Sequence, residues 1–177
     1  SRPAPARPEW GVDRRLLQGV FLAIMSQYHL PESVMRVEKR SIVLPQPFVT
    51  ESGAVLPQAP VAYEAYGNPA GPVIVLCHGG ISSHHAAGRY GENDAVPGWW
   101  DGIIGPERPF DTDRFRILSL NALGGMYGSC SPRSTDPMTG CRYGPTFPAI
   151  TLRDQVRFAA AFLDAMGVDQ VWCMAGP

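Results

Sequence analysis

The stretch VIVLCHGG, residues 73–80, decides the fold of this chain. Its first five residues are all apolar, they follow Gly71-Pro72, and a histidine and two glycines end the run. A short apolar run between such breakers predicts a central strand that is buried on both faces of a sheet. Two further apolar runs, residues 116–120 and 168–174, predict two more core strands.

Thr151 and Asp154 have the spacing of a capping box, in which each side chain bonds an early backbone amide of a helix. They predict a helix that begins there and ends at Gly167. Its expected apolar face consists of Val156, Ala159, Ala160, Leu163 and Met166. The order strand, strand, helix, strand, with apolar strands, is typical of an α/β sheet.

Shorter β-rich runs precede the central strand. Residues 41–44, 48–49 and 61–66 alternate around a Glu51-Ser52-Gly53 turn and predict antiparallel strands at a sheet edge. Residues 1–9 are proline-rich and predict a flexible leader, and residues 13–30 have the apolar spacing of an amphipathic helix. That helix either packs on its own domain or contacts another chain. We therefore divide the chain into residues 1–40 and a core of residues 41–177.

Composition excludes several functional classes. The 177 residues carry 15 basic and 16 acidic side chains, a net charge of -1, so nothing favours binding to nucleic acid. No apolar run approaches the roughly 20 residues of a membrane span. Lys39 is the only lysine. Without a CxxC pair or a secretory leader, we expect a cytoplasmic protein with buried thiols at Cys77 and Cys173. Cys130 and Cys141 share a loop and are either free or paired.

A set of short motifs runs in order from about residue 50 to the end, and the set resembles the homoserine O-acetyltransferase family of α/β-hydrolase-fold acyltransferases. The motifs are ESG (51–53), VAYEAYG (61–67), VLCH (75–78), PGWWD (97–101) with IG (104–105), FDTDRF (110–115), NALGG (121–125) with GS (128–129) and Pro132, YG (143–144) with FP (147–148), and ITLRD (150–154).

This resemblance implies a fold and a reaction. The fold is the N-terminal half of an α/β-hydrolase domain, with a mostly parallel sheet and antiparallel edge strands. The reaction moves an acyl group, by default from acetyl-CoA, to the hydroxyl of homoserine or a related metabolite through a serine acyl-enzyme. Acyl-CoA is then a co-substrate, and neither a tightly bound cofactor nor a metal is expected. We also expect the complete protein to form homo-oligomers.

The resemblance places the nucleophile next to the last predicted strand. In this fold a G-x-S-x-G elbow follows a central strand, and the acid and histidine of the triad come later in the chain. Gly176 would be the first glycine of that elbow, so the nucleophilic serine would follow Pro177. All three triad residues would then lie in a following segment or a companion chain. A cut before the serine, a fragment and a degraded protein are the three explanations that we consider.

The loop after the central strand would supply an oxyanion-hole amide. Acyl transfer needs N–H donors for the oxyanion of its tetrahedral intermediate, and one comes from this loop in α/β-hydrolases. Gly80 is the expected donor, with Gly79 and Ile81 as neighbouring candidates. Ile81 and Asn121 are candidate substrate-binding residues, although Asn121 could instead cap its own loop. The family usually has a bulky residue and a threonine where this chain has Gly80 and Ile81, which leaves the acceptor open.

The histidines of the chain are expected to be structural. His78, His84 and His85 precede the predicted nucleophile, whereas the triad histidine of the fold follows it. The pair His84-His85 has no partner with the spacing of metal ligands. Two rival functions remain: an esterase on the same scaffold, which transfers the acyl group to water, and a non-catalytic binding fragment.

Overall fold

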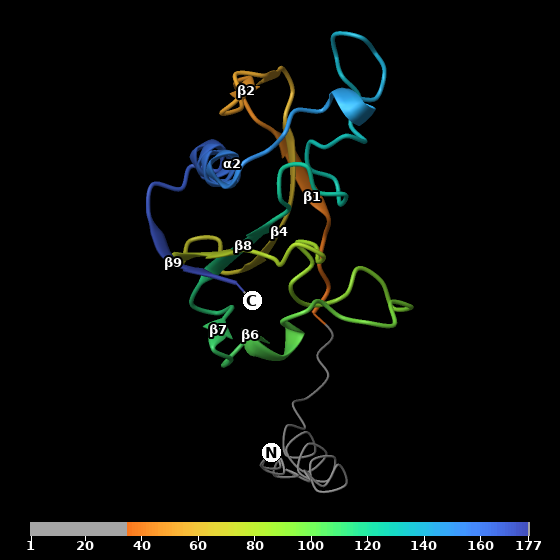
Figure 1. Ribbon diagram of the computed structural model, residues 1–177. Coiled ribbons are helices and arrows are strands. Elements are labelled where there is room, and N and C mark those ends of the chain that lie inside the picture. Colours follow the sequence, from red (N-terminus) through yellow and green to blue (C-terminus); the bar gives the residue numbers. More distant parts are fainter. Residues whose placement is uncertain (1–34, 177) are drawn as a thin grey trace, which may run out of the picture. The chain divides into compact units, whose positions relative to one another are not determined.

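The computed structural model describes residues 35–176 (Figure 1). The leader and helix expected within residues 1–34 lie outside the described residues. The elements of the main sheet are β1 (Arg40–Val43), β4 (Pro60–Gly67), β5 (Val73–Leu76), β8 (Arg116–Leu120) and β9 (Val171–Ala175). They lie in the order β1-β4-β8-β5-β9, and α2 (Leu152–Ala165) is the one α-helix of the described range. The α/β fold class is therefore confirmed.

Four of the five strands run in the same direction. The strands β8, β5 and β9 pair in parallel, whereas β4 is antiparallel to both β1 and β8. The expectation of a mostly parallel sheet with antiparallel pairing at one edge is thus confirmed. A parallel arrangement brings the carboxyl ends of β8, β5 and β9 to one edge of the sheet, which is where ligands bind in open α/β folds.

Two small two-stranded sheets and two short helices lie outside the main sheet. The strands β2 (Phe48–Val49) and β3 (Val55–Leu56) form an antiparallel hairpin, and β6 (Ile104–Gly105) pairs in parallel with β7 (Phe110–Asp111). Two short 3-10 helices, η1 and η2, cover Asp101–Ile103 and Gly144–Thr146.

The strand β5 is buried on both faces, as its sequence predicts. Val73 and Val75 belong to one apolar cluster, which also contains Phe158 and Phe162 of α2. Ile74 and Leu76 belong to a second cluster on the opposite face, where Trp99 and Trp100 pack. Alternate side chains of one strand thus join two separate cores, which is the reason for a continuous apolar run.

The capping box of α2 is confirmed, and its predicted apolar face is confirmed in part: Ala159, Leu163 and Met166 pack against the core, whereas Val156 and Ala160 are exposed. The Thr151 hydroxyl accepts the Asp154 amide, and the Asp154 carboxylate accepts the Thr151 amide. The buried residues are Asp154, Phe158 and Phe162, one helical turn apart, whereas Val156 is 70% exposed. Two phenylalanines at this spacing bury more apolar area than the smaller residues of the predicted face, and they set the helix rotation.

The strand β9 is shorter and less buried than its sequence predicts. It begins at Val171 rather than residue 168, and Trp172 and Met174 are 64% and 60% exposed. The reason is its place as the outer strand of the described sheet, with one edge unpaired. Cys77 is exposed and Cys173 is half-buried, so the expectation of two buried thiols is wrong. All four cysteines are free.

The packed unit extends to Val37, which is 8% exposed and lies ahead of residue 41. No helix among the described residues combines the length and the hydrophobicity that crossing a membrane requires.

Candidate functional site

A cavity of about 490 Å³ opens where β5 and β8 end. Its walls are three backbone segments: the loop that leaves β5 (78–82), the loop that leaves β8 (122–127) and the first turns of α2, which contribute Leu152 and Gln155. Gly79, Gly80 and Ile81, the residues expected to stabilise an anion, all line this cavity. Gly80 and Ile81 are exposed, so an incoming molecule can reach their backbone.

The loop after β5 presents free amides. The Ser82 amide donates to the Gly79 carbonyl at 3.1 Å, which closes a tight turn. The amides of Gly79, Gly80 and Ile81 find no acceptor among residues 35–176. A Cβ placed on Gly80 would meet nothing within 4 Å. The glycine therefore leaves open space directly beside unoccupied N–H donors, which is the arrangement that an anionic oxygen needs.

His78 ties the two loops of this cavity together. Its Nε2 accepts the Ala122 amide at 3.1 Å, and its Nδ1 lies 2.8 Å from the Gly79 carbonyl oxygen. The first contact requires a lone pair on Nε2, so Nδ1 carries the hydrogen and donates to the carbonyl. Both ring nitrogens are thus engaged with backbone, which supports the expectation that His78 is structural.

Gln155 anchors the second loop to the helix. Its side-chain oxygen accepts the Leu123 amide at 3.0 Å, and its side-chain nitrogen donates to the Leu123 carbonyl at 2.8 Å. This pair of bonds fixes the loop after β8 against the N-terminal end of α2. Sequence reasoning missed Gln155, because only the rotation of the helix reveals that it faces the edge of the sheet.

The chain leaving β9 passes the base of the same loop. The Cys77 amide donates to the Ala175 carbonyl at 2.8 Å, and a Cβ added to Gly176 would lie 2.5 Å from the Cys77 carbonyl oxygen. Only glycine fits this approach. Partial burial raises the pKa of the Cys77 thiol, so it stays protonated near neutral pH and is a poor nucleophile.

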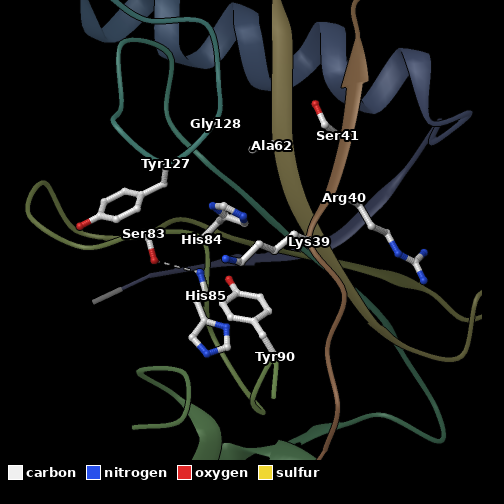
Figure 2. Close-up of a pocket in the computed structure, with 10 residues that line it drawn as sticks. All are labelled: Lys39, Arg40, Ser41, Ala62, Ser83, His84, His85, Tyr90, Tyr127 and Gly128. Atoms are coloured by element: carbon white, nitrogen blue, oxygen red, sulfur yellow. Dashed lines mark hydrogen bonds between the residues drawn. The ribbon is translucent and has the colours of Figure 1, made fainter. Parts of the chain in front are cut away.

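A second cavity, of about 540 Å³, lies beside the first, and Tyr127 lines both. Figure 2 shows Lys39, His84 and Tyr90 pointing toward one another within it, whereas Arg40 points away. The Lys39 ammonium lies 4.3 Å from the centre of the Tyr90 ring. His84 is only 4% exposed, and neither of its ring nitrogens has a hydrogen-bond partner within the described range.

Burial lowers the pKa of His84, so this imidazole is neutral at pH 7. The Glu64 carboxylate and the Asn121 side chain oppose that shift, but Asn121 and His84 do not reach hydrogen-bond geometry. Asn121 itself is fully buried, donates weakly to the Ala122 carbonyl at 3.4 Å and lines neither cavity.

Glu64 is a fully buried carboxylate that fixes residues 85–90 through a network of hydrogen bonds. Glu64 accepts the Tyr66 hydroxyl, the Tyr90 hydroxyl at 2.5 Å and a contact from Nδ1 of His85 at 3.1 Å. The Tyr66 hydroxyl in turn accepts the amides of Ala86 and Ala87 at 3.0 and 3.1 Å. Glu64 thereby fixes residues 85–90, which follow the loop that carries the free amides.

Metal binding has no support within residues 35–176, where no three His, Cys, Asp or Glu side chains gather as ligands. Sequence reasoning also missed Lys39 and Tyr127. Lys39 stands out in the sequence as the only lysine, but its place in the second cavity depends on the pairing of β1 with β4.

No protein-family model matches the chain. Among curated relatives, it is 41% identical over 84% of its length to a homoserine O-succinyltransferase of Alkalilimnicola ehrlichii. It is also 41% identical over 81% of its length to a homoserine O-acetyltransferase of Geobacter sulfurreducens. The chain spans about 40% of the length of each of these relatives.

Solved structures give the same answer for the fold. The homoserine O-acetyltransferase of Bacillus anthracis matches 81% of this chain and 40% of its own, with 30% identity and a TM-score of 0.74. Esterase E22 matches 80% of this chain and 40% of its own, with 39% identity and a TM-score of 0.72. The α/β-hydrolase fold expected from the sequence is therefore confirmed.

Proposed function

We propose that this chain, a homologue of the homoserine O-acyltransferases, is the part of an O-acyltransferase that holds one half of the oxyanion hole. The loop of His78, Gly79, Gly80 and Ile81 would stabilise the tetrahedral intermediate through backbone amides. The observation that carries this proposal is the row of three amides without acceptors among residues 35–176, beside a glycine with open space, at the carboxyl end of β5.

The reaction would run in two steps. A serine takes the acyl group from acyl-CoA and releases the thiol, and the acyl-enzyme then passes the group to the hydroxyl of a small acceptor. Both steps place negative charge on the carbonyl oxygen of the acyl group. One preorganised amide at that position is worth about 100- to 1,000-fold in kcat.

The nucleophile would follow β9. Support comes from Gly176, which packs against Cys77 as tightly as only glycine can and so brings the end of β9 next to the loop of free amides. The remaining triad residues would come from a following segment or a companion chain. The exposed Trp172 and Met174 and the unpaired edge of β9 give such a segment an apolar surface to cover.

Acetyl-CoA and homoserine are the default substrates, in agreement with the name of the Geobacter relative, a homoserine O-acetyltransferase. The donor stays open between acetyl and succinyl groups, since relatives of both kinds are equally similar. The four free cysteines support action in a reducing compartment, for which we propose the cytoplasm.

The decisive experiment measures thiol release from acetyl-CoA by the natural full-length protein, with and without homoserine. We expect release that depends on homoserine and yields O-acetylhomoserine by mass spectrometry. Equal thiol release with and without homoserine would overturn the transferase proposal and favour an esterase. The similarity to esterase E22 supports this second candidate.

The role of the loop can be tested by removing one amide. Gly80→Pro deletes the N–H, whereas Gly80→Ala keeps it and adds a methyl group in open space. We expect kcat of the proline variant to be at least tenfold below that of the alanine variant, with equal thermal stability. Equal kcat values would assign the oxyanion to Gly79, Ile81 or another group.

A further inference from the structure

The second cavity contains two polar side chains that the proposed oxyanion hole does not use. They are Lys39, the only lysine of the chain, and His84, which is buried and has no hydrogen-bond partner in the described range. A buried imidazole with both nitrogens unpaired costs stability unless a ligand or water meets them. The cavity therefore has the chemistry of a binding site rather than of a packing defect.

Its charge favours an anion. Lys39 points inward over Tyr90, and no carboxylate faces the opening among the residues that line it (Figure 2). The carboxylate beneath, Glu64, is 0% exposed and already accepts from two tyrosines and His85. The ammonium of Lys39 forms no ion pair with any residue of the described range, so it remains available to a negatively charged group.

The distance between the second cavity and the loop of Gly80 limits which part of a substrate could reach this cavity. The strand β1, which follows Lys39, lies three strand positions from β5, about 14 Å at the usual spacing. An acetyl or succinyl group held at Gly80 is too short to cover that distance, whereas the extended pantetheine arm of an acyl-CoA is long enough. Tyr127 lines both cavities, which makes them neighbours along such a path.

The walls suit a nucleotide. Tyr127 is half exposed and can present aromatic surface to a base, whereas the Tyr90 ring lies between His85 and the Lys39 ammonium and helps to hold that ammonium in place. A neutral His84 can donate one N–H to a phosphate oxygen. A volume of about 540 Å³ is within the range of cofactor sites.

We propose that this cavity binds the phosphate-bearing nucleotide end of the acyl-CoA donor, with Lys39 as its cation. This inference rests on the proposed function, because it assumes that the thioester lies at the loop of Gly80. It assigns Lys39 to recognition of the donor and gives it no part in the chemical steps.

The test compares donors with and without the nucleotide, in the natural full-length protein. KM is measured for acetyl-CoA and for S-acetylpantetheine in wild type, Lys39→Ala, Lys39→Arg and the control Arg153→Ala. Arg153 is exposed on α2 and bridges only Glu51, so its loss changes the net charge equally. We expect the ratio of the two KM values, acetyl-CoA over S-acetylpantetheine, to rise about tenfold in Lys39→Ala.

The ratio should recover in large part in Lys39→Arg and stay at the wild-type value in Arg153→Ala. An unchanged ratio in Lys39→Ala overturns the proposal. If Lys39→Ala raises the KM for succinyl-CoA but not that for acetyl-CoA, the proposal is also overturned, because Lys39 would then bind the carboxylate of the acyl group.

Direct binding separates this proposal from the proposed function. If neither donor is turned over, the transferase fails, and titration with 3′,5′-ADP, CoA and inorganic phosphate still decides the cavity. We expect 3′,5′-ADP and CoA to bind, each about tenfold more weakly in Lys39→Ala. Inorganic phosphate that binds as tightly as 3′,5′-ADP would reduce the cavity to a phosphate-ion site and overturn the assignment.

Discussion

Gly176 lies against Cys77 so closely that a Cβ on the glycine would come within 2.5 Å of the Cys77 carbonyl oxygen. The two residues are almost 100 positions apart in the chain, yet they bring the ends of β9 and β5 together. A nucleophile that follows β9 and amides that follow β5 could then serve one carbonyl carbon. This contact is the structural basis of the proposed active site.

Gly176→Ala should therefore damage both the fold and the site. The added methyl group collides with backbone, which cannot move without breaking the Cys77–Ala175 hydrogen bond. We expect a loss of about 1–3 kcal/mol in the free energy of unfolding, measured by urea denaturation. Gly102→Ala is the matched control, since its Cβ would meet nothing within 4 Å. Equal stability of the two variants would contradict the contact.

Asp154 should make stability depend on acid pH. Its bond from the Thr151 amide, followed by that from the Glu51 amide, lowers the pKa of this carboxyl in the folded protein. The unfolded chain then binds the proton more readily, so stability rises with pH. The contribution is complete above the unfolded pKa of about 3.9 and is lost as pH falls toward the lower folded value.

Urea midpoints between pH 2.5 and 7 check this expectation. Wild type should lose stability more steeply below about pH 4 than Asp154→Asn, which is less stable at pH 7. The exposed Asp169 provides the control, because Asp169→Asn removes a carboxylate without hydrogen bonds in the described range. Parallel curves for wild type and Asp154→Asn would contradict the role of the carboxylate.

The Tyr66 hydroxyl should contribute to stability in addition to the packing of its ring. Its hydroxyl donates to Glu64 and accepts the amides of Ala86 and Ala87, and burial together with Glu64 raises the pKa of Tyr66 far above its usual value. Tyr66→Phe leaves both amides without an acceptor. We expect a loss of about 1–3 kcal/mol in the free energy of unfolding, measured by urea denaturation.

The control for this measurement is Tyr143→Phe. The Tyr143 hydroxyl is buried and unpartnered within residues 35–176, so its removal should change stability little or raise it slightly. Similar losses in both variants would mean that Tyr66 contributes through packing and not through its hydrogen bonds.

Local patterns predicted much of the fold, and tertiary packing decided what they missed. The run at 73–77 predicts a doubly buried strand because both faces must be apolar, and the Thr151–Asp154 spacing predicts the cap because both partners lie within one turn. The rotation of α2 depends instead on which side chains fill the space over β2 and β4, where Phe158 meets Phe48 and Phe162 meets Tyr63. Spacing alone does not contain that information.

The candidate site also has a part that local sequence predicts and a part that only the folded structure reveals. The loop of Gly79, Gly80 and Ile81 is continuous in sequence, so its motif could be recognised. The second cavity joins Lys39, His84 and Tyr127 from three distant segments, and no local pattern relates them. The role of His78 also needed the structure, since its bond to Ala122 spans 44 residues.

His78 should act as a brace between two loops and not as a base, and two substitutions separate these roles. His78→Ala removes the acceptor of the Ala122 amide, so we expect a loss of about 1 kcal/mol in stability and a lower kcat in the full-length protein, because the loop of free amides loses its support. Glutamine can place its side-chain oxygen near the position of Nε2, but it cannot take up a proton at neutral pH. If His78 is a brace, His78→Gln should recover most of the stability and of kcat that His78→Ala loses. If His78 is instead a general base, His78→Gln should still restore stability, but its kcat should stay as low as that of His78→Ala.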